Sequence, residues 1–231
     1  MGRSADSGKT PSSDGTLFDT PAPPDQLQVT FTSLAKGAVL HRVHLDRYRA
    51  DECNPGVSGN ARFSPIADEQ GKPIPTLYGG ATMVCALMET VFHDVPHSAG
   101  FKSLDKGKLA GQVHSTIRIE RELALVDLAS VALRKMGVTR KQLIDTEKHA
   151  YPATRLWASA IHRLCPAAQG LSWISRQDDS ARAVMLFGDR IGAGSLQRIS
   201  PPRSLLDDTD AYDVVLDLAD RIGLKILQGM R

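Results

Sequence analysis

The sequence predicts a single α+β domain, and three observations support this fold class. Short runs with strand periodicity are mixed with a few helical stretches from Leu27 onward. The 231 residues are 42% hydrophobic, which is enough for a substantial core. No repeat with a period of about 20 to 50 residues and no heptad array favours a solenoid or a coiled coil. We therefore expect one domain over residues 27–231.

Residues 1–26 differ in composition from the rest of the chain. Ser, Gly, Pro, Asp and Thr dominate, so this segment lacks the apolar surface that would offset the entropy lost on ordering. We expect a flexible N-terminal tail with one docked patch at Leu17 and Phe18. GKT at 8–10 imitates the end of a phosphate-binding P-loop, but Arg3 stands where that motif needs its first Gly.

The domain begins with strand signals. The alternating run LQVTFTS (27–33) and the apolar run AVLHRVHL (38–45) are separated by Gly37. They predict two strands, or a short helix followed by a strand. TLYGG at 76–80 then predicts a strand that enters a turn.

One helix carries a carboxylate at the border of the core. Thr82 can cap a helix over 83–95, which Pro96 is expected to end. Glu89 falls at the edge of its apolar stripe. The stripe consists of Val84, Leu87, Met88, Val91 and Phe92.

The second half of the domain alternates between strands and helices. We expect strands at 111–120, 123–128, 171–175 and 182–188. We expect helices at 139–146, at 151–164 and over the first part of 210–227. Pro152 suits the first turn of the helix at 151–164, and Gly170 is expected to end it.

Composition excludes several classes of partner. The chain has 28 Lys and Arg against 26 Asp and Glu, so its net charge of +2 creates no field that would select nucleic acid or a membrane. No apolar run approaches the roughly 20 residues that span a bilayer, and no secretory signal is evident, so we expect a cytoplasmic protein. The three cysteines are widely spaced, which indicates neither a disulfide framework nor a zinc knuckle.

The sequence contains only incomplete versions of the motifs for a metal site, a dinucleotide-binding fold and a serine hydrolase. His93 and His97 have the spacing of a helical zinc pair, but Pro96 lies between them, so we interpret both as surface histidines. His41 and His44 should point to opposite faces of a strand. We predict no metal. The glycines at 188–194 lack the dinucleotide fingerprint, and there is no G-x-S-x-G elbow.

Five polar residues lie in otherwise apolar elements: Arg42, Arg62, Tyr78, Glu89 and Ser175. Taken singly, each has an ordinary explanation, such as an arginine that pairs at the surface or a tyrosine that packs. Taken together they suit a dinucleotide, because guanidinium groups hold phosphates, an aromatic ring stacks on a flat ring and a carboxylate faces developing positive charge. Such a site would accept NAD, whose ribose–nicotinamide bond breaks through an oxocarbenium-like state.

The order of these residues resembles the RES domain, a family named for Arg, Glu and Ser and known as the toxin half of Xre–RES toxin–antitoxin pairs. The motifs that match lie between Val39 and Arg190. They are LHRVH with Arg42, NARFSP with Arg62, TLYGG with Tyr78, ALMETVFHDV with Glu89 and GLSWISRQDD with Ser175. Ala61 replaces the usual Gly before the second Arg, and YGG stands where YLA is common, but neither departure removes a charged group.

The resemblance implies a single RES domain over 27–231, similar in fold to ADP-ribosyltransferase toxins, with central mixed or antiparallel sheets and flanking helices. It implies that NAD is the substrate and that the protein degrades NAD+ by hydrolysis or phosphorolysis, with inorganic phosphate as the acceptor in the second case. The alternative is an ADP-ribosyltransferase that modifies a protein such as phosphoribosyl pyrophosphate synthetase. A cognate Xre-like antitoxin is the expected protein partner.

The residues then take expected roles in NAD cleavage. Glu89 would stabilise the oxocarbenium-like ribose, and Arg42 and Arg62 would anchor phosphate and ribose oxygens. Tyr78 would stack on nicotinamide, and Ser175 would add a polar contact. We group Arg62 and Ser175 with Glu89 as catalytic. A non-catalytic binding module and an RNA-cleaving toxin stay open, although 5% aromatic content and balanced charge disfavour the second.

Overall fold

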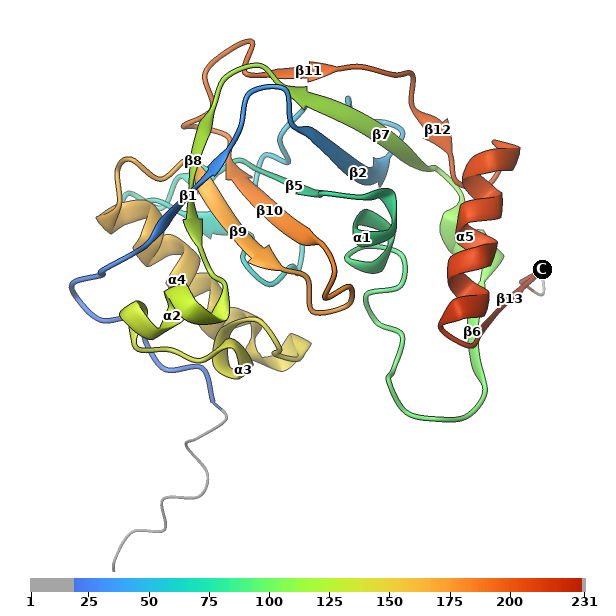
Figure 1. The fold of residues 1–231 in the computed structure, drawn as a ribbon, viewed down its shortest axis with the longest axis horizontal. Helices are drawn as coiled ribbons and strands as arrows, with labels where there is room; N and C mark the ends of the chain where they lie inside the picture. Colours follow the sequence, from blue (N-terminus) through green and yellow to red (C-terminus); the bar gives the residue numbers. More distant parts are fainter. Residues whose placement is uncertain (1–18, 230–231) are drawn as a thin grey trace, which may run out of the picture.

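The computed structural model describes residues 19–229 and contains thirteen strands, five α-helices and two 3-10 helices (Figure 1). The strands are β1 (Phe31–Leu34), β2 (Val39–Leu45), β3 (Ile66–Ala67), β4 (Pro73–Ile74), β5 (Thr76–Gly80), β6 (Lys102–Asp105), β7 (Gln112–Ile119), β8 (Leu123–Asp127), β9 (Gly170–Ile174), β10 (Arg182–Phe187), β11 (Leu196–Arg198), β12 (Arg203–Ser204) and β13 (Leu224–Leu227). The helices are α1 (Met83–Met88), α2 (Ser130–Met136), α3 (Arg140–Leu143), α4 (Tyr151–Leu164), α5 (Thr209–Arg221), η1 (Lys106–Leu109) and η2 (Lys148–Ala150). None of the helices within 19–229 has the length and apolar character needed to cross a membrane.

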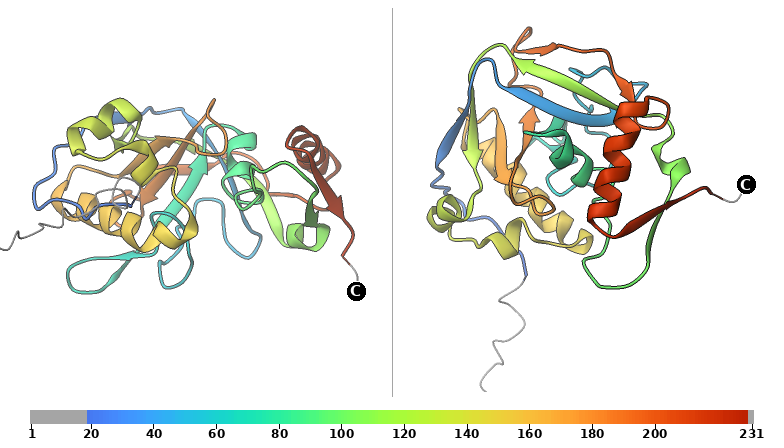
Figure 2. Two further views of the ribbon diagram at one scale, coloured as in Figure 1. Left: turned by 90° about the horizontal axis from the view of Figure 1, so that it is seen from below. Right: turned by 45° about the vertical axis from the view of Figure 1, so that its right-hand side comes forward.

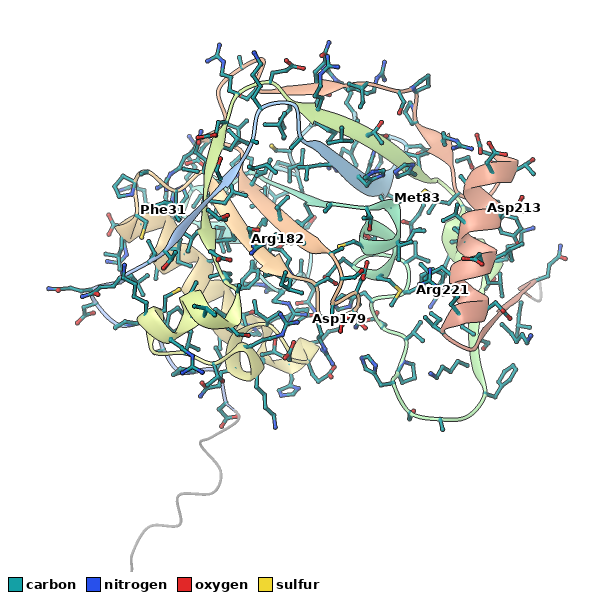
Figure 3. The ribbon with its side chains drawn as sticks, viewed as in Figure 1. Phe31, Met83, Asp179, Arg182, Asp213 and Arg221 are labelled. Atoms are coloured by element: carbon teal, nitrogen blue, oxygen red, sulfur yellow. The ribbon has the colours of Figure 1, made fainter. Side chains whose placement is uncertain are left out.

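Nine of the strands form one large mixed sheet, which confirms the predicted α+β class. The order is β1-β8-β9-β10-β5-β2-β7-β11, and β12 also pairs with β7. Neighbouring strands are antiparallel except β8 and β9. Arg182 of β10 is labelled in Figure 3. It links β8 and β9, because its guanidinium donates to Asp127 and Ser172 at 3.1 Å each. Two small sheets, β3-β4 and the parallel pair β6-β13, complete the fold.

The large sheet nearly divides between β2 and β5. These two strands share one paired position, His41 opposite Gly80, whereas β2 pairs with β7 at seven positions and β5 with β10 at five. The strands therefore diverge beyond that point, and α1 follows β5 to pack against both of them. A Cβ atom at Gly80 would lie 2.9 Å from Cys85 Sγ, so only glycine lets the start of α1 fold back this closely.

Three hydrophobic clusters hold the elements together. The first lies between the β8-β9-β10 region and helices α2 to α4, and it contains both Trp157 and Trp173. The second, which includes Leu87 and Val215, joins α1 to α5, β6 and β13, and Figure 2 shows these last three elements gathered at one end of the molecule. The third, which includes Ile117, consists mainly of residues from β2, β5, β7, β8 and β10. Together the three clusters hold β2, β5, β9 and α1 around the point where β2 and β5 diverge.

The end of one helix and the role of one glycine differ from the sequence-based prediction. Helix α1 ends at Met88, with Glu89 as its C-cap, seven residues before the predicted end at 95. The chain turns there because the N–H groups of Thr90 and Phe92 both donate to the Leu87 carbonyl. Helix α4 covers 151–164 as predicted, but Gly170 lies six residues beyond its end and does not terminate it. Gly170 belongs to β9 instead, where a Cβ atom would lie 2.3 Å from a neighbouring carbonyl oxygen.

Part of the segment predicted as a tail contacts the domain. Thr20 donates to the Gln142 carbonyl at 2.5 Å, and the Trp157 indole donates to the Pro21 carbonyl at 2.7 Å. The prediction of a flexible tail otherwise falls on residues 1–18, including the patch at Leu17 and Phe18, which lie outside the described residues.

Candidate active site

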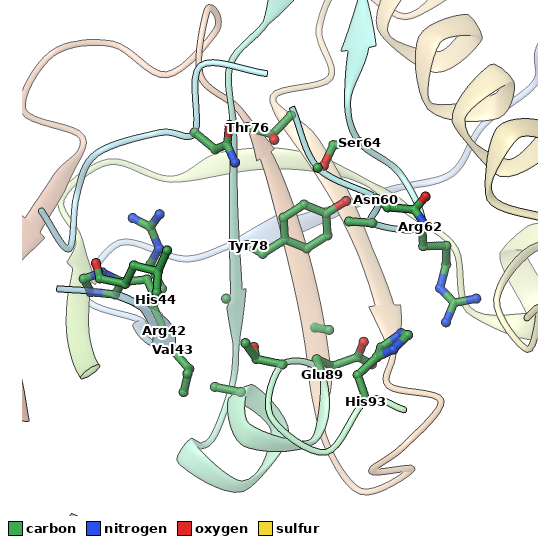
Figure 4. A pocket seen from close by; sticks show the side chains of 18 of the residues that line it. Arg42, Val43, His44, Asn60, Arg62, Ser64, Thr76, Tyr78, Glu89 and His93 are labelled. Carbon is green, nitrogen blue, oxygen red and sulfur yellow. The ribbon is translucent and has the colours of Figure 1, made fainter. Parts of the chain in front are cut away.

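A cavity of about 450 Å³ lies where β2 and β5 diverge. Its walls come from β2, the 58–64 loop, β5, α1 and the start of α4. Four of the five predicted site residues line it: Arg42, Arg62, Tyr78 and Glu89 (Figure 4). Ser175 does not line the cavity but contacts one of its walls through Glu89.

The Glu89 carboxylate is held by the Ser175 hydroxyl at 2.6 Å. Ser175 directly follows β9 and is fully buried, and its Oγ accepts the backbone N–H groups of Gln177 and Asp178 at 3.0 Å each. Because the two N–H groups occupy the hydroxyl's lone pairs, its single proton is directed at the carboxylate. This arrangement orients the Glu89 side chain in the cavity wall.

Arg62 is buried beside the cavity with hydrogen-bonding capacity left over. Its Nη1 donates to the Thr146 hydroxyl at 2.7 Å and the Thr146 carbonyl at 3.2 Å, and its guanidinium lies 5.4 Å from the centre of the Tyr151 ring. Its Nη2 is buried and has no partner among the described residues. Burial lowers the pKa of Arg62, which reflects the cost of desolvating the cation. An anionic ligand in the cavity would relieve that cost.

Aromatic rings form the wall on the β5 and β9 side. The Tyr78 hydroxyl accepts the Phe63 N–H at 3.2 Å, and its ring meets Trp173 edge-on at 6.3 Å. Burial raises the pKa of Tyr78, so the phenol stays neutral. The Trp173 indole N–H is buried and, like Arg62 Nη2, lacks a partner among the described residues. The wall therefore offers flat apolar surface, and one of its rings keeps a buried donor without a partner among the described residues.

Arg42 lies across the cavity, and one nitrogen of its guanidinium group is hydrogen-bonded to main-chain carbonyls. Its Nη1 donates to the carbonyls of Ala50 at 2.6 Å, Glu52 at 2.7 Å and Arg49 at 3.2 Å. Burial lowers its pKa, and Cys53, Glu52 and Asp51 oppose that shift. Arg42 thus braces the 49–52 loop, and its predicted contact with phosphate would use the other guanidinium nitrogens.

The interpretation of His93 as a surface histidine is wrong, because its side chain lines the cavity and is only 20% exposed. His93 Nε2 lies 2.8 Å from the Tyr151 hydroxyl, and its Nδ1 lies 3.0 Å from an Asp94 carboxylate oxygen. Lys148 approaches the other oxygen of Asp94 at 2.6 Å. The spacing of four residues between Glu89 and His93 was the available signal. His97 is exposed.

A second histidine group lies between β2 and β7. His41 Nδ1 lies 2.9 Å from His114 Nε2, with the rings stacked at 5.1 Å, whereas His44 contacts Ser115 at 3.0 Å. Burial, with Coulombic contributions from His41, Arg203 and His44, lowers the pKa of His114 to about 4. Among residues 19–229, no group of three or more His, Cys, Asp or Glu side chains is arranged to hold a metal ion.

Comparison with known proteins yields one match. A family model described as the RES domain matches residues 39–209, from the first residue of β2 to the first residue of α5. This range contains all five of the predicted polar residues. Neither the curated proteins nor the solved structures include a match to the chain.

Proposed function

The chain belongs to the RES domain family, and on this premise we propose that it cleaves the nicotinamide–ribose bond of NAD+ and passes ADP-ribose to water or inorganic phosphate. The observation that carries the proposal is the Glu89 carboxylate, oriented by Ser175 in the wall of a cavity that also holds a buried arginine with an unused donor. The volume of about 450 Å³ falls within the range of about 300 to 1,000 Å³ that is common for ligand sites.

The proposed chemistry needs a fixed negative charge near the ribose. When the C1′–N bond breaks, its electron pair leaves with nicotinamide, which departs neutral, and positive charge develops on C1′ and the ring oxygen. A carboxylate at that position stabilises the charge directly or through a ribose hydroxyl. Because Ser175 already orients Glu89, little reorganisation would be required during the reaction.

The remaining residues suit the rest of the substrate. Arg62 Nη2 would bond a phosphate or ribose oxygen, which would satisfy a buried donor that is otherwise costly. Tyr78 and Trp173 would border the nicotinamide ring, with the Trp173 N–H free to meet an acceptor on it. Arg42 would contribute positive charge from the opposite wall.

The decisive experiment follows NAD and its products by mass spectrometry with purified protein, with and without inorganic phosphate. Loss of NAD with release of nicotinamide is the expected result, and phosphorylated ADP-ribose would identify phosphate as the acceptor. Intact NAD in both mixtures would overturn NAD degradation. The same mixture with cell extract would then detect ADP-ribosylated protein, the product expected of the alternative transferase.

A protein that destroys NAD requires control in the cell that makes it. We expect expression to lower cellular NAD and slow growth. We also expect a protein partner of the Xre-like antitoxin type to relieve both effects. NAD measured in expressing cells, with an inactive Glu89→Gln variant as control, tests the first expectation.

A further inference from the structure

We propose that Tyr151, His93 and Asp94 form a proton relay that activates the acceptor of ADP-ribose whenever the attacking oxygen of that acceptor carries a proton. The inference rests on the proposed NAD cleavage and adds the residues that serve the incoming nucleophile. All three residues line the cavity, and none was among the five polar residues that predicted the site, although His93 and Asp94 lie in the same motif as Glu89.

The direction of the hydrogen bonds follows from the chemistry of the groups. Asp94 is a carboxylate and can only accept, so the proton of His93 resides on Nδ1, 3.0 Å from Asp94 Oδ1. His93 Nε2 is then an acceptor, and the Tyr151 hydroxyl donates to it at 2.8 Å. Lys148 at 2.6 Å from the other Asp94 oxygen keeps that carboxylate ionised and in place.

This order leaves the Tyr151 oxygen as a pure acceptor toward the cavity. Its only proton is directed at His93, so any ligand group that bonds to this oxygen must itself donate. Water and hydroxyl groups meet that requirement, whereas azide and the dianionic oxygens of phosphate do not. The relay therefore recognises a protonated nucleophile.

The charges around Tyr151 suit a transient shift of its proton. Burial raises the pKa of the phenol, while Arg62 and Arg176 oppose that rise and Glu89 and Asp94 reinforce it. The Arg62 guanidinium lies 5.4 Å from the ring centre. Tyr151 therefore keeps its proton at rest, yet it has cations beside it that stabilise added electron density during transfer.

The step balances without another reactant. The water oxygen attacks C1′ as the C1′–N bond breaks, and nicotinamide leaves with the electron pair. One proton of the water passes to the Tyr151 oxygen as the phenol proton passes to His93 Nε2. The resulting imidazolium is paired with Asp94, and it returns the proton to solvent after the products leave.

The position of the relay relative to Glu89 supports this role. His93 follows Glu89 by four residues, and both side chains extend from the same short segment after α1 into the cavity (Figure 4). Gln177 fixes this segment by donating to the His93 carbonyl at 3.0 Å. The carboxylate that would face the ribose and the imidazole that would receive the Tyr151 proton are therefore held by one stretch of backbone.

The test compares two acceptors in the Tyr151→Phe and His93→Gln variants. Without phosphate, each variant should lose roughly a hundredfold in kcat for NAD hydrolysis, with little change in KM. The double variant should lose no more than either single one, because relay members act as a unit. Azide needs no deprotonation, so azide added as acceptor should restore nicotinamide release and form an azido product.

The exposed His97→Gln variant is the matched control and should behave as the unsubstituted protein. Thermal unfolding of every variant checks that the fold is retained. Unimpaired hydrolysis in Tyr151→Phe, additive losses in the double variant, or no azide product from the variants would each overturn the relay alone. Intact NAD with the unsubstituted protein would overturn the proposed function and the relay together.

Discussion

Ser175 and Glu89 are joined by a hydrogen bond of 2.6 Å although they lie 86 positions apart in the chain. Ser175 directly follows β9, and Glu89 caps α1, so the contact links the end of a strand of the large sheet to the helix beside the point where β2 and β5 diverge. The Ser175 Oγ accepts two backbone N–H groups, so the hydroxyl proton is left to donate to Glu89. Its role in the site is to orient a carboxylate.

Glu89→Gln should abolish most of the proposed activity while leaving the fold intact. Glutamine keeps the shape but not the charge, and one such electrostatic contact typically contributes about 3 kcal/mol at the transition state, or roughly a hundredfold in rate. Steady-state nicotinamide release measures the effect. Glu122→Gln, an exposed position, is the control. Full activity in a folded Glu89→Gln variant would remove Glu89 from the mechanism.

Ser175→Ala should lower both stability and rate. Two half-buried N–H groups lose their acceptor, which should cost about 1 to 3 kcal/mol in the free energy of unfolding. The rate should fall less than in Glu89→Gln, because the carboxylate remains but is no longer oriented. Denaturant unfolding and kcat test both parts against Ser180→Ala in an exposed turn. An unchanged kcat would contradict the orienting role.

Arg62→Lys should weaken NAD binding more than it slows turnover. Lysine keeps the charge but cannot place two donors in a fixed fork, so it cannot bond Thr146 and a ligand together. Losing one charged hydrogen bond of about 1.5 to 3 kcal/mol should raise KM for NAD by roughly 10- to 100-fold. Arg163→Lys on the exposed face of α4 is the control. An unchanged KM would exclude a contact between Arg62 and NAD.

Trp173 should report ligand binding by fluorescence. The chain has two tryptophans, and only Trp173 lines the cavity, whereas Trp157 donates to the Pro21 carbonyl elsewhere. Nicotinamide or NAD should quench the emission of Trp157→Phe, in which Trp173 alone remains. The same ligand should leave the emission of Trp173→Phe nearly unchanged. Quenching of equal size in both variants would place the ligand outside this cavity.

Stability should fall as the pH drops from about 6.5 to about 4. The folded pKa of His114 is lowered to about 4, and those of His41 and His44 are also lowered, so the unfolded chain binds more protons in this window. His114 alone should contribute on the order of 1 to 3 kcal/mol. His114→Gln should flatten the dependence of Tm on pH, whereas exposed His149→Gln should not. Parallel curves for His114→Gln and the unsubstituted protein would contradict this account.

Several elements could be predicted from sequence because their signals are local. The apolar runs that form β2, β5, β9 and β10 and the pattern of α4 each depend on residues a few positions apart. The motifs with Arg42, Arg62, Tyr78, Glu89 and Ser175 likewise supported the family resemblance, which the family match confirms. The end of α1 was missed because it depends on how the turn after Leu87 packs against the rest of the fold.

The sequence by itself thus determined the fold class, the family and the polar residues proposed for the site, because periodicity and motif order are properties of neighbouring residues. Only the tertiary structure decided which side chains share a cavity and which donors are left without partners. His93 meets Tyr151 across 58 positions, and Arg62 meets Thr146 across 84. Such contacts depend on how the divided sheet and its helices pack, and no local pattern encodes that packing.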